Sequence, residues 1–179
     1  MTIALFGATG RTGKLIIQLA IKRGYNIKAH CRNALSLAEF KDSIEIFEGS
    51  LEDNEVINNV ITGSDTVVIA FGQRKNSSVP FTKDATEKII DLMKQNNVTR
   101  LICLTGALIG QYECRTILFE LIRKIQLKRN YDLIKDRDGQ EDVVMGSYLD
   151  WTIVKPPRLV DTPAENRFIT GTVLKVGFF

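Results

Sequence analysis

Short apolar runs alternate with segments of helical spacing along most of this chain. In parallel sheets that are covered on both faces, the buried strands read as such continuous runs, and helices fill the intervals between them. The pattern therefore predicts an α/β fold with a doubly wound parallel sheet. The strands are expected over Thr2–Phe6, Asn26–His30, Ile44–Phe47, Thr66–Phe71, Leu101–Leu104 and Trp151–Val154.

Helical periodicity is clear in several of these intervals. Apolar residues recur at helical spacing from Leu15 until Gly24 ends the pattern, and Thr82–Gln95 and Asp138–Met145 are expected to form further helices. The segment Thr116–Arg129 has an apolar stripe and a basic side. We interpret it as a helix with an ordinary core stripe beneath a solvated basic face. A membrane-binding or partner-docking helix is the alternative.

The composition is that of an ordinary globular domain. With 179 residues, of which 44% are hydrophobic and 25% charged, we expect a single domain over residues 1–179. The net charge of +3 is too small to favour nucleic acid or a membrane surface as a partner. The chain lacks both the ~20 apolar residues of a membrane span and the pattern of a secretory signal. We therefore expect a cytoplasmic protein, monomeric or homodimeric.

Few side chains here are suited to metal binding or nucleophilic catalysis. The cysteines, Cys31, Cys103 and Cys114, form no Cys-x-x-Cys motif, which argues against a disulfide framework or a zinc site. A single histidine, His30, leaves little for a multi-histidine metal site or a Ser-His-Asp triad. We therefore expect reduced cysteines, no metal site and chemistry carried by a bound cofactor.

A glycine-rich turn follows the first predicted strand. Its sequence, Gly7-Ala-Thr-Gly10-Arg-Thr-Gly13, places backbone N–H groups and the positive end of a helix where a pyrophosphate can bind. Gly7 permits the tight turn, Gly10 lets phosphates approach the backbone, and Gly13 allows the helix to pack closely on the strand. The hydroxyls of Thr9 and Thr12 can add donors. A glycine-rich turn without a ligand is the alternative.

The end of the second predicted strand distinguishes the two nicotinamide cofactors. NAD sites place an acidic residue about 20 residues after the turn, where it holds the ribose hydroxyls. This chain has no carboxylate between Gly7 and Glu39, and Arg32 stands near that place. A guanidinium can bind a 2′-phosphate through a charge-assisted hydrogen bond, with Arg11 assisting from the turn. The sequence thus predicts that NADPH is preferred over NADH. The alternative is that Arg32 is an ordinary surface residue.

Several segments together form a recognisable series. In order along nearly the whole chain they are Gly7–Gly13, Cys31-Arg32, Glu48–Asp53, Ala70-Phe71-Gly72-Gln73-Arg74, Leu104–Ala107 and Lys155-Pro156-Pro157 followed by Asp161. This series resembles the atypical short-chain dehydrogenase/reductases with an NmrA-like NAD(P)-binding Rossmann domain, and among them the biliverdin reductase B or flavin reductase group. The resemblance implies a Rossmann-like doubly wound parallel sheet, with the substrate-side elements mainly in residues 106–179.

The resemblance also implies where the cofactor lies. Residues after the fourth strand would line its adenosine-to-phosphate part, residues after the third would flank the adenine, and residues after the fifth and sixth would border the nicotinamide. Open α/β sheets gather ligands at these carboxyl ends of strands. In this sequence the three groups are Ala70, Phe71, Gly72 and Arg74; Ser50 and Leu51; and Thr105 and Pro156.

The family also suggests how this chain ends. Its members typically continue past the region of Ile169–Val176 with another strand and helix, so we expect this chain to lack a C-terminal strand and helix. The apolar end, Gly177-Phe178-Phe179, then indicates either a truncated sequence or contact with a partner subunit.

The implied activity is hydride transfer from NADPH to a small-molecule acceptor of flavin, quinone or tetrapyrrole type. The cofactor carries the reactivity, so few catalytic side chains are needed. Thr105 is a catalytic candidate, because Gly106 stands where the group commonly has a serine. Arg158 stands where it often has a histidine, and it would suit an anionic acceptor. The alternatives are a non-catalytic NmrA-like regulator that senses NADP(H) and a quinone or isoflavone-type reductase.

Tyr131 and Lys135 have the spacing of the Tyr/Lys dyad in ketone-reducing short-chain dehydrogenases. That dyad requires both side chains on one helical face beside the nicotinamide. When the chain is aligned backwards from its Lys-Pro-Pro segment, the family's helix position falls on Arg137 and Glu141. This alignment leaves Tyr131 early, in or near a loop, so the dyad is the weaker catalytic hypothesis.

Overall fold

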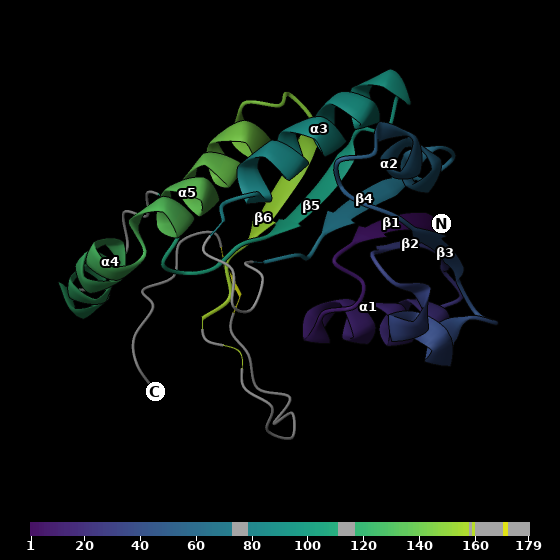
Figure 1. Ribbon diagram of the computed structural model, residues 1–179, viewed down its shortest axis with the longest axis horizontal. Helices are drawn as coiled ribbons and strands as arrows, with labels where there is room; N and C mark the ends of the chain where they lie inside the picture. Colours follow the sequence, from purple (N-terminus) through teal and green to yellow (C-terminus); the bar gives the residue numbers. More distant parts are fainter. Residues whose placement is uncertain (73–78, 111–116, 158, 160–169, 172–179) are drawn as a thin grey trace.

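Six parallel strands form one sheet in the part of the chain that the structure describes (Figure 1). This computed structural model describes residues 1–72, 79–110, 117–157, 159 and 170–171. The strand order is β3-β2-β1-β4-β5-β6, so the order reverses between β1 and β4, as in a Rossmann-like fold. The strands are β1 (Thr2–Phe6), β2 (Asn26–Cys31), β3 (Glu45–Glu48), β4 (Thr66–Ile69), β5 (Arg100–Leu104) and β6 (Asp150–Val154).

Helices cover both faces of this sheet, which confirms the predicted doubly wound α/β fold (Figure 1). One face carries α1 (Arg11–Lys22) and a 3₁₀ helix (Ala34–Phe40), and the other carries α2, α3 and α5. The remaining helix, α4, packs on α5. The bounds of these four are α2 (Asn54–Ile61), α3 (Thr82–Gln95), α4 (Ile117–Arg129) and α5 (Tyr131–Met145).

The central strands explain the unbroken apolar runs of the sequence. All four residues of β4 are buried, as are four of the five in β1, because each strand has packed helices on both sides. Alternate side chains therefore enter two separate cores. Ala4 and Phe6 pack towards α2 and α3, whereas Ile3 and Leu5 pack towards α1.

Two predicted boundaries were wrong by two residues or more, and the bounds of β2, β3, β5 and β6 differ from the prediction by one residue at one or both ends. The fourth strand ends at Ile69 and not at Phe71, because its partner β1 ends at Phe6 and Gly7 then turns the chain away with φ +90°. The last helix begins at Tyr131 and not at Asp138, so Tyr131 does not lie in a loop.

The expected core stripe of α4 was also wrong in the described part of that helix. Ile117 is 91% exposed, and Leu121 and Ile125 are exposed as well. None of the described helices is long and apolar enough to cross a membrane. The expectations about residues 172–179 concern positions outside the described residues.

Candidate cofactor site

The glycine-rich turn packs tightly between β1, the end of β4 and α1. Gly7 has φ +90°, and a Cβ there would lie 2.6 Å from the carbonyl carbon of Ala70. A Cβ on Gly13 would lie 2.7 Å from Ala8 O, and closer still to Gly7 O. Both approaches are too short for a real side chain. The geometry therefore requires glycine at Gly7 for the turn and at Gly13 for the close packing of the helix.

The first turn of α1 is open towards a ligand. Gly10 is the N-cap residue and supplies no side chain to cap the helix, and the first turn contains no acidic residue. Gly10 N donates a hydrogen bond to Gly7 O at 3.1 Å, which fixes the turn. The N–H groups of a first helical turn and the positive end of the helix dipole favour an anion at this place.

A pocket of about 230 Å³ opens at the carboxyl ends of β1, β2 and β4. This is the crevice at the reversal of strand order, where open α/β sheets bind ligands. It brings together eight residues that the sequence predicted and three that it did not. The predicted ones are Gly7, Thr9, Gly10, Arg32, Leu51, Ala70, Phe71 and Gly72, and the others are His30, Cys31 and Phe81.

The charge of this pocket is positive. Arg32 is exposed at the end of β2, and no Asp or Glu stands among the described residues that line the pocket. The described lining thus carries a guanidinium at the end of β2 and no carboxylate partner for ribose hydroxyls.

His30 and Cys31 form the buried wall beside Arg32. The Nε2 atom of His30 lies 3.1 Å from Gly49 O and donates to it. Burial lowers the pKa of His30, the hydrogen bond to Gly49 opposes this effect, and the charge of Arg32 adds to it. Burial raises the pKa of the Cys31 thiol. Sequence position next to Arg32 is a signal that could have identified both residues, whereas Phe81 has no comparable signal.

The other predicted cofactor residues lie outside the described lining of the pocket. Arg11, Thr12 and Gly13 form the first turn of α1. The Ser50 hydroxyl accepts a hydrogen bond from Glu52 N, and Pro156 O accepts one from Ala107 N. Thr105 belongs to a separate polar cluster described below. Arg74 and Arg158 lie outside the described residues.

Tyr131 and Lys135 lie on an exposed part of α5. The Tyr131 side chain is 59% exposed, and Lys135 Nζ lies 5.9 Å from the centre of its ring. The two side chains thus contact each other, and neither lines the pocket in its described part.

Arg137 connects the pocket to the ends of two strands. Its guanidinium donates hydrogen bonds to Phe71 O at 3.2 Å and to Leu104 O at 3.3 Å, so it spans the carboxyl ends of β4 and β5. Burial lowers the pKa of Arg137, against the effect of nearby acidic groups such as Glu141. The sequence alignment placed Arg137 on the helix but gave it no role in the site.

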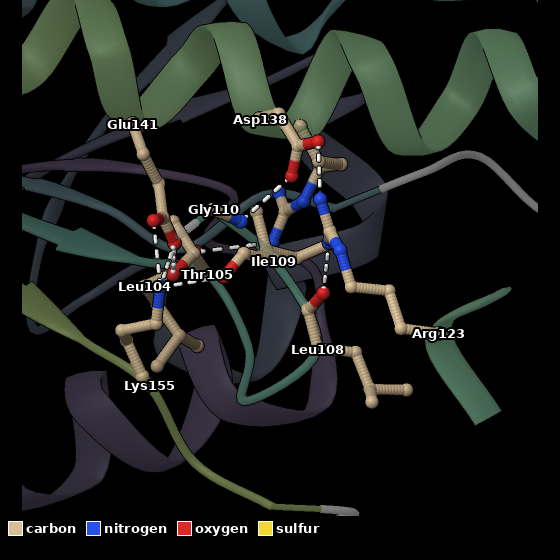
Figure 2. Close-up of polar contacts among 10 residues, drawn as sticks. Leu104, Thr105, Leu108, Ile109, Gly110, Arg123, Asp138, Glu141 and Lys155 are labelled. Carbon is tan, nitrogen blue, oxygen red and sulfur yellow. Dashed lines mark hydrogen bonds and ion pairs between the residues drawn. The ribbon is translucent and has the colours of Figure 1, made fainter. Parts of the chain in front are cut away.

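The loop that follows β5 is held by two polar clusters (Figure 2). In the first, Thr105 and Lys155 both bind Glu141. In the second, Asp138 pairs with Arg123 at 2.6 Å and accepts a hydrogen bond from Gly110 N, also at 2.6 Å. Arg123 donates to Leu108 O as well. These contacts fix the loop beside the place where the nicotinamide is expected.

Known proteins resemble this chain over most of its length. The chain is 29% identical over 183 residues to the uncharacterized protein YwnB of Bacillus subtilis, covering 98% of this chain and 79% of YwnB. It is 34% identical over 185 residues to oxidoreductase stcQ of Emericella nidulans, covering 91% of this chain and 67% of stcQ. The chain spans 58–79% of the length of the five curated relatives compared first.

Solved structures share the fold. A short-chain dehydrogenase/reductase of Veillonella parvula in complex with NADP has a TM-score of 0.75 at 17% identity, covering 90% of this chain and 71% of that chain. ChuY of Escherichia coli O157:H7, described as an anaerobillin reductase, has a TM-score of 0.73 at 19% identity. The match covers 97% of this chain and 84% of ChuY. A family model described as NAD(P)H-binding matches residues 7–176, and the chain therefore belongs to this NAD(P)H-binding family.

Proposed function

We propose that this protein is an NADPH-dependent reductase of a small-molecule acceptor of flavin, quinone or tetrapyrrole type. The observation that carries the proposal is the pocket at the strand reversal. It has the glycine turn on one side, Arg32 on the other, and no carboxylate among its described lining residues. When bound, the nicotinamide supplies a hydride to the acceptor.

Each side of the pocket has its own part in binding. The N–H groups at the start of α1 would hold the diphosphate close to Gly10, with the Thr9 hydroxyl beside them. Arg32 would bind the 2′-phosphate. A hydrogen bond of this charge-assisted kind contributes about 1.5–3 kcal/mol, which corresponds to roughly 10- to 100-fold in affinity. NADPH is therefore the preferred cofactor.

The substrate side is suited to hydride transfer because this chemistry needs alignment and a dry crevice more than an acid or base. Arg137 holds the ends of β4 and β5 together, and the clusters around Glu141 and Asp138 fix the loop after β5. A rigid wall of this kind would keep the acceptor in register with the cofactor. The neighbour ChuY supports a tetrapyrrole among the acceptors to be tested.

The experiment is steady-state oxidation of NADPH with flavin mononucleotide, a quinone and biliverdin, together with titration of NADPH and NADH. We expect tight NADPH binding and turnover with at least one acceptor. The substitution Arg32→Ala should weaken NADPH far more than NADH, whereas Arg129→Ala, which removes an exposed arginine from α4, should change neither. Binding without turnover of any acceptor would refute the reductase and favour a regulator that senses NADP(H).

A further inference from the structure

His30 stands where dinucleotide-binding folds recognise the ribose of the adenosine. It is the last residue but one of β2, about 20 residues after the glycine turn, and it lines the pocket together with Arg32. Folds that bind NAD place a carboxylate there, which accepts hydrogen bonds from the ribose hydroxyls. In this chain an imidazole takes that position, and no carboxylate stands among the described residues of the lining.

One nitrogen of the His30 ring is fixed and the other is open. Nε2 lies 3.1 Å from Gly49 O, and a carbonyl can only accept, so Nε2 carries a hydrogen in both protonation states of the ring. Nδ1 has no hydrogen-bond partner among the described residues. In those ranges Gln140 Oε1 is the one fully buried side-chain atom without a partner, so Nδ1 is not sealed in the core. The ring is only 5% exposed, and the pocket is the opening that reaches Nδ1.

Aromatic side chains lie beside the His30 ring on the neighbouring strands. The centroids of the Phe6 and His30 rings are 5.6 Å apart, and Phe47 is the register partner of His30 on β3. Burial here disfavours the charged form and lowers the pKa of His30, against the effect of the hydrogen bond to Gly49. Without a ligand the ring is therefore mostly neutral at pH 7.

Arg32 is the charged side chain that acts on His30, and it lowers the pKa of the ring further. The carboxylates of Glu48, at the end of β3, and of Asp53, at the start of α2, each accept a hydrogen bond from a backbone N–H group. Burial raises the pKa of the Cys31 thiol, so this neighbour in the pocket wall stays neutral at pH 7. An anion bound in the pocket is therefore what would favour a charged ring.

On the basis of the proposed function, we propose that His30 is a specificity-determining residue that takes up a proton when the 2′-phosphate of NADP binds, and donates it from Nδ1 to that phosphate beside Arg32. NAD has a hydroxyl at this position, and the neutral ring accepts a hydrogen bond from it through Nδ1. The proton comes from the solvent and stays on the ring, and no covalent bond to the cofactor forms. The preference for NADP over NAD therefore rises as the pH falls from 8 towards 6.

The direction of proton exchange separates the contribution of His30 from that of Arg32. An anion beside the ring raises the pKa of His30, so NADP binding at pH 7 takes up a proton. A guanidinium alone has the opposite effect, because it lowers the pKa of the phosphate, which is about 6 when free. Binding through Arg32 alone would then release a small fraction of a proton. Proton uptake is thus the signature of the imidazole.

The first test is calorimetric titration of the full chain with NADP⁺ and NAD⁺ at pH 7, in two buffers of different ionisation enthalpy. The dependence of the heat on the buffer gives the number of protons exchanged. We expect uptake of roughly half a proton with NADP⁺ and close to none with NAD⁺. In His30→Gln, whose amide can still donate to Gly49 O but never carries a charge, the uptake should disappear. The control Tyr148→Gln removes a 99% exposed ring outside the described lining of the pocket, and it should keep the uptake.

The second test follows the ring directly by NMR. His30 is the single histidine of the chain, so its ring signal is identified without a variant. The titration midpoint should lie below 6.5 in the unliganded protein and with NAD⁺, and above 6.5 with NADP⁺. This measurement tests the proposal even where His30→Gln fails to fold. Where it folds, the NADP⁺ affinity of the unsubstituted protein should rise about tenfold relative to that of His30→Gln between pH 8 and pH 6.

Three results would overturn this role of His30. Proton release, or no exchange, on NADP⁺ binding would show that Arg32 binds the phosphate without the imidazole. Equal uptake with both nucleotides, or uptake that persists in His30→Gln, would assign the proton to another group. The third is a His30 midpoint that is the same in both complexes. Failure of the folded protein to bind either nucleotide would instead refute the proposed function itself, so the two failures are distinguishable.

Discussion

Asp136 gives the most direct test of how α5 positions the wall of the pocket. Its carboxylate is only 9% exposed and lies at the start of α3, where the N-cap residue Phe81 has no capping side chain of its own. It accepts hydrogen bonds from the backbone N atoms of Phe81, Thr82 and Lys83, at 3.2, 2.9 and 3.0 Å, and from the Thr82 hydroxyl at 2.7 Å. Asp136 thus caps α3 from a different helix, and it also holds Phe81 against the pocket.

The cost of Asp136→Ala follows from these contacts. Loss of an ordinary N-cap costs about 0.5–2 kcal/mol, and hydrogen bonds to a charged group are worth about 1.5–3 kcal/mol. Because the four bonds share one carboxylate and are not additive, we expect the free energy of unfolding to fall by about 2–4 kcal/mol. Asp136→Asn should cost less, since its amide oxygen still accepts.

The assay is urea unfolding followed by circular dichroism. Burial alone would raise the pKa of Asp136, but the hydrogen bonds from Lys83, Thr82 and Phe81 together lower it. The stabilisation is therefore fully present above the ordinary pKa of 3.8 and is lost as the pH falls through the lower pKa of the folded state. Wild type and Asp136→Asn should converge in acid. Asp142→Ala, which removes an exposed carboxylate from the same helix, is the control. A change within about 0.5 kcal/mol for Asp136→Ala would refute the capping role.

Three further predictions concern the pocket and the core. Gly13→Ala should abolish NADPH binding and cost about 1–3 kcal/mol of stability, because its Cβ would overlap the turn. The control Gly63→Ala, at φ +73° in open space, should keep NADPH binding. NADPH binding by Gly13→Ala would contradict the tight packing of the turn. The single histidine, His30, should titrate below pH 6.5 by NMR in the unliganded protein, because burial lowers its pKa. The stability that the neutral buried ring contributes is therefore lost as the pH falls below 6.5. A titration midpoint above 6.5 would exclude the buried, neutral ring. Burial raises the pKa of Cys103 to about 12, so iodoacetamide at pH 8 should leave it unlabelled in the folded protein, and rapid labelling would be inconsistent with that burial.

The parts of the fold that the sequence predicted are those with regular apolar periods. The bounds of β1 and α3 were confirmed at both ends, because the first is a continuous buried run and the second has a clear apolar side. The glycine turn is equally readable, since Gly7 and Gly13 stand where any Cβ would collide with backbone.

The part that the sequence did not reveal is the polar core of α5. This helix buries Asp136, Gln140 and Glu141 with Val144, so its inward face is mostly polar and carries little hydrophobic period. Prediction from apolar residues therefore places the start of the helix too late. It also gives Glu141 and Arg137 no role in the site. Their partners, Thr105, Lys155 and the strand-end carbonyls, come from distant segments and become neighbours only when the sheet forms.

Calorimetric titration with NADPH and NADH tests the central claim most directly. That claim is that the crevice holds a dinucleotide on the glycine turn and selects its 2′-phosphate through Arg32. We predict that the unsubstituted protein binds NADPH roughly 10- to 100-fold more tightly than NADH, and that Arg32→Ala removes most of this difference. No heat with either nucleotide in folded protein, or equal losses for both in Arg32→Ala, would contradict the account.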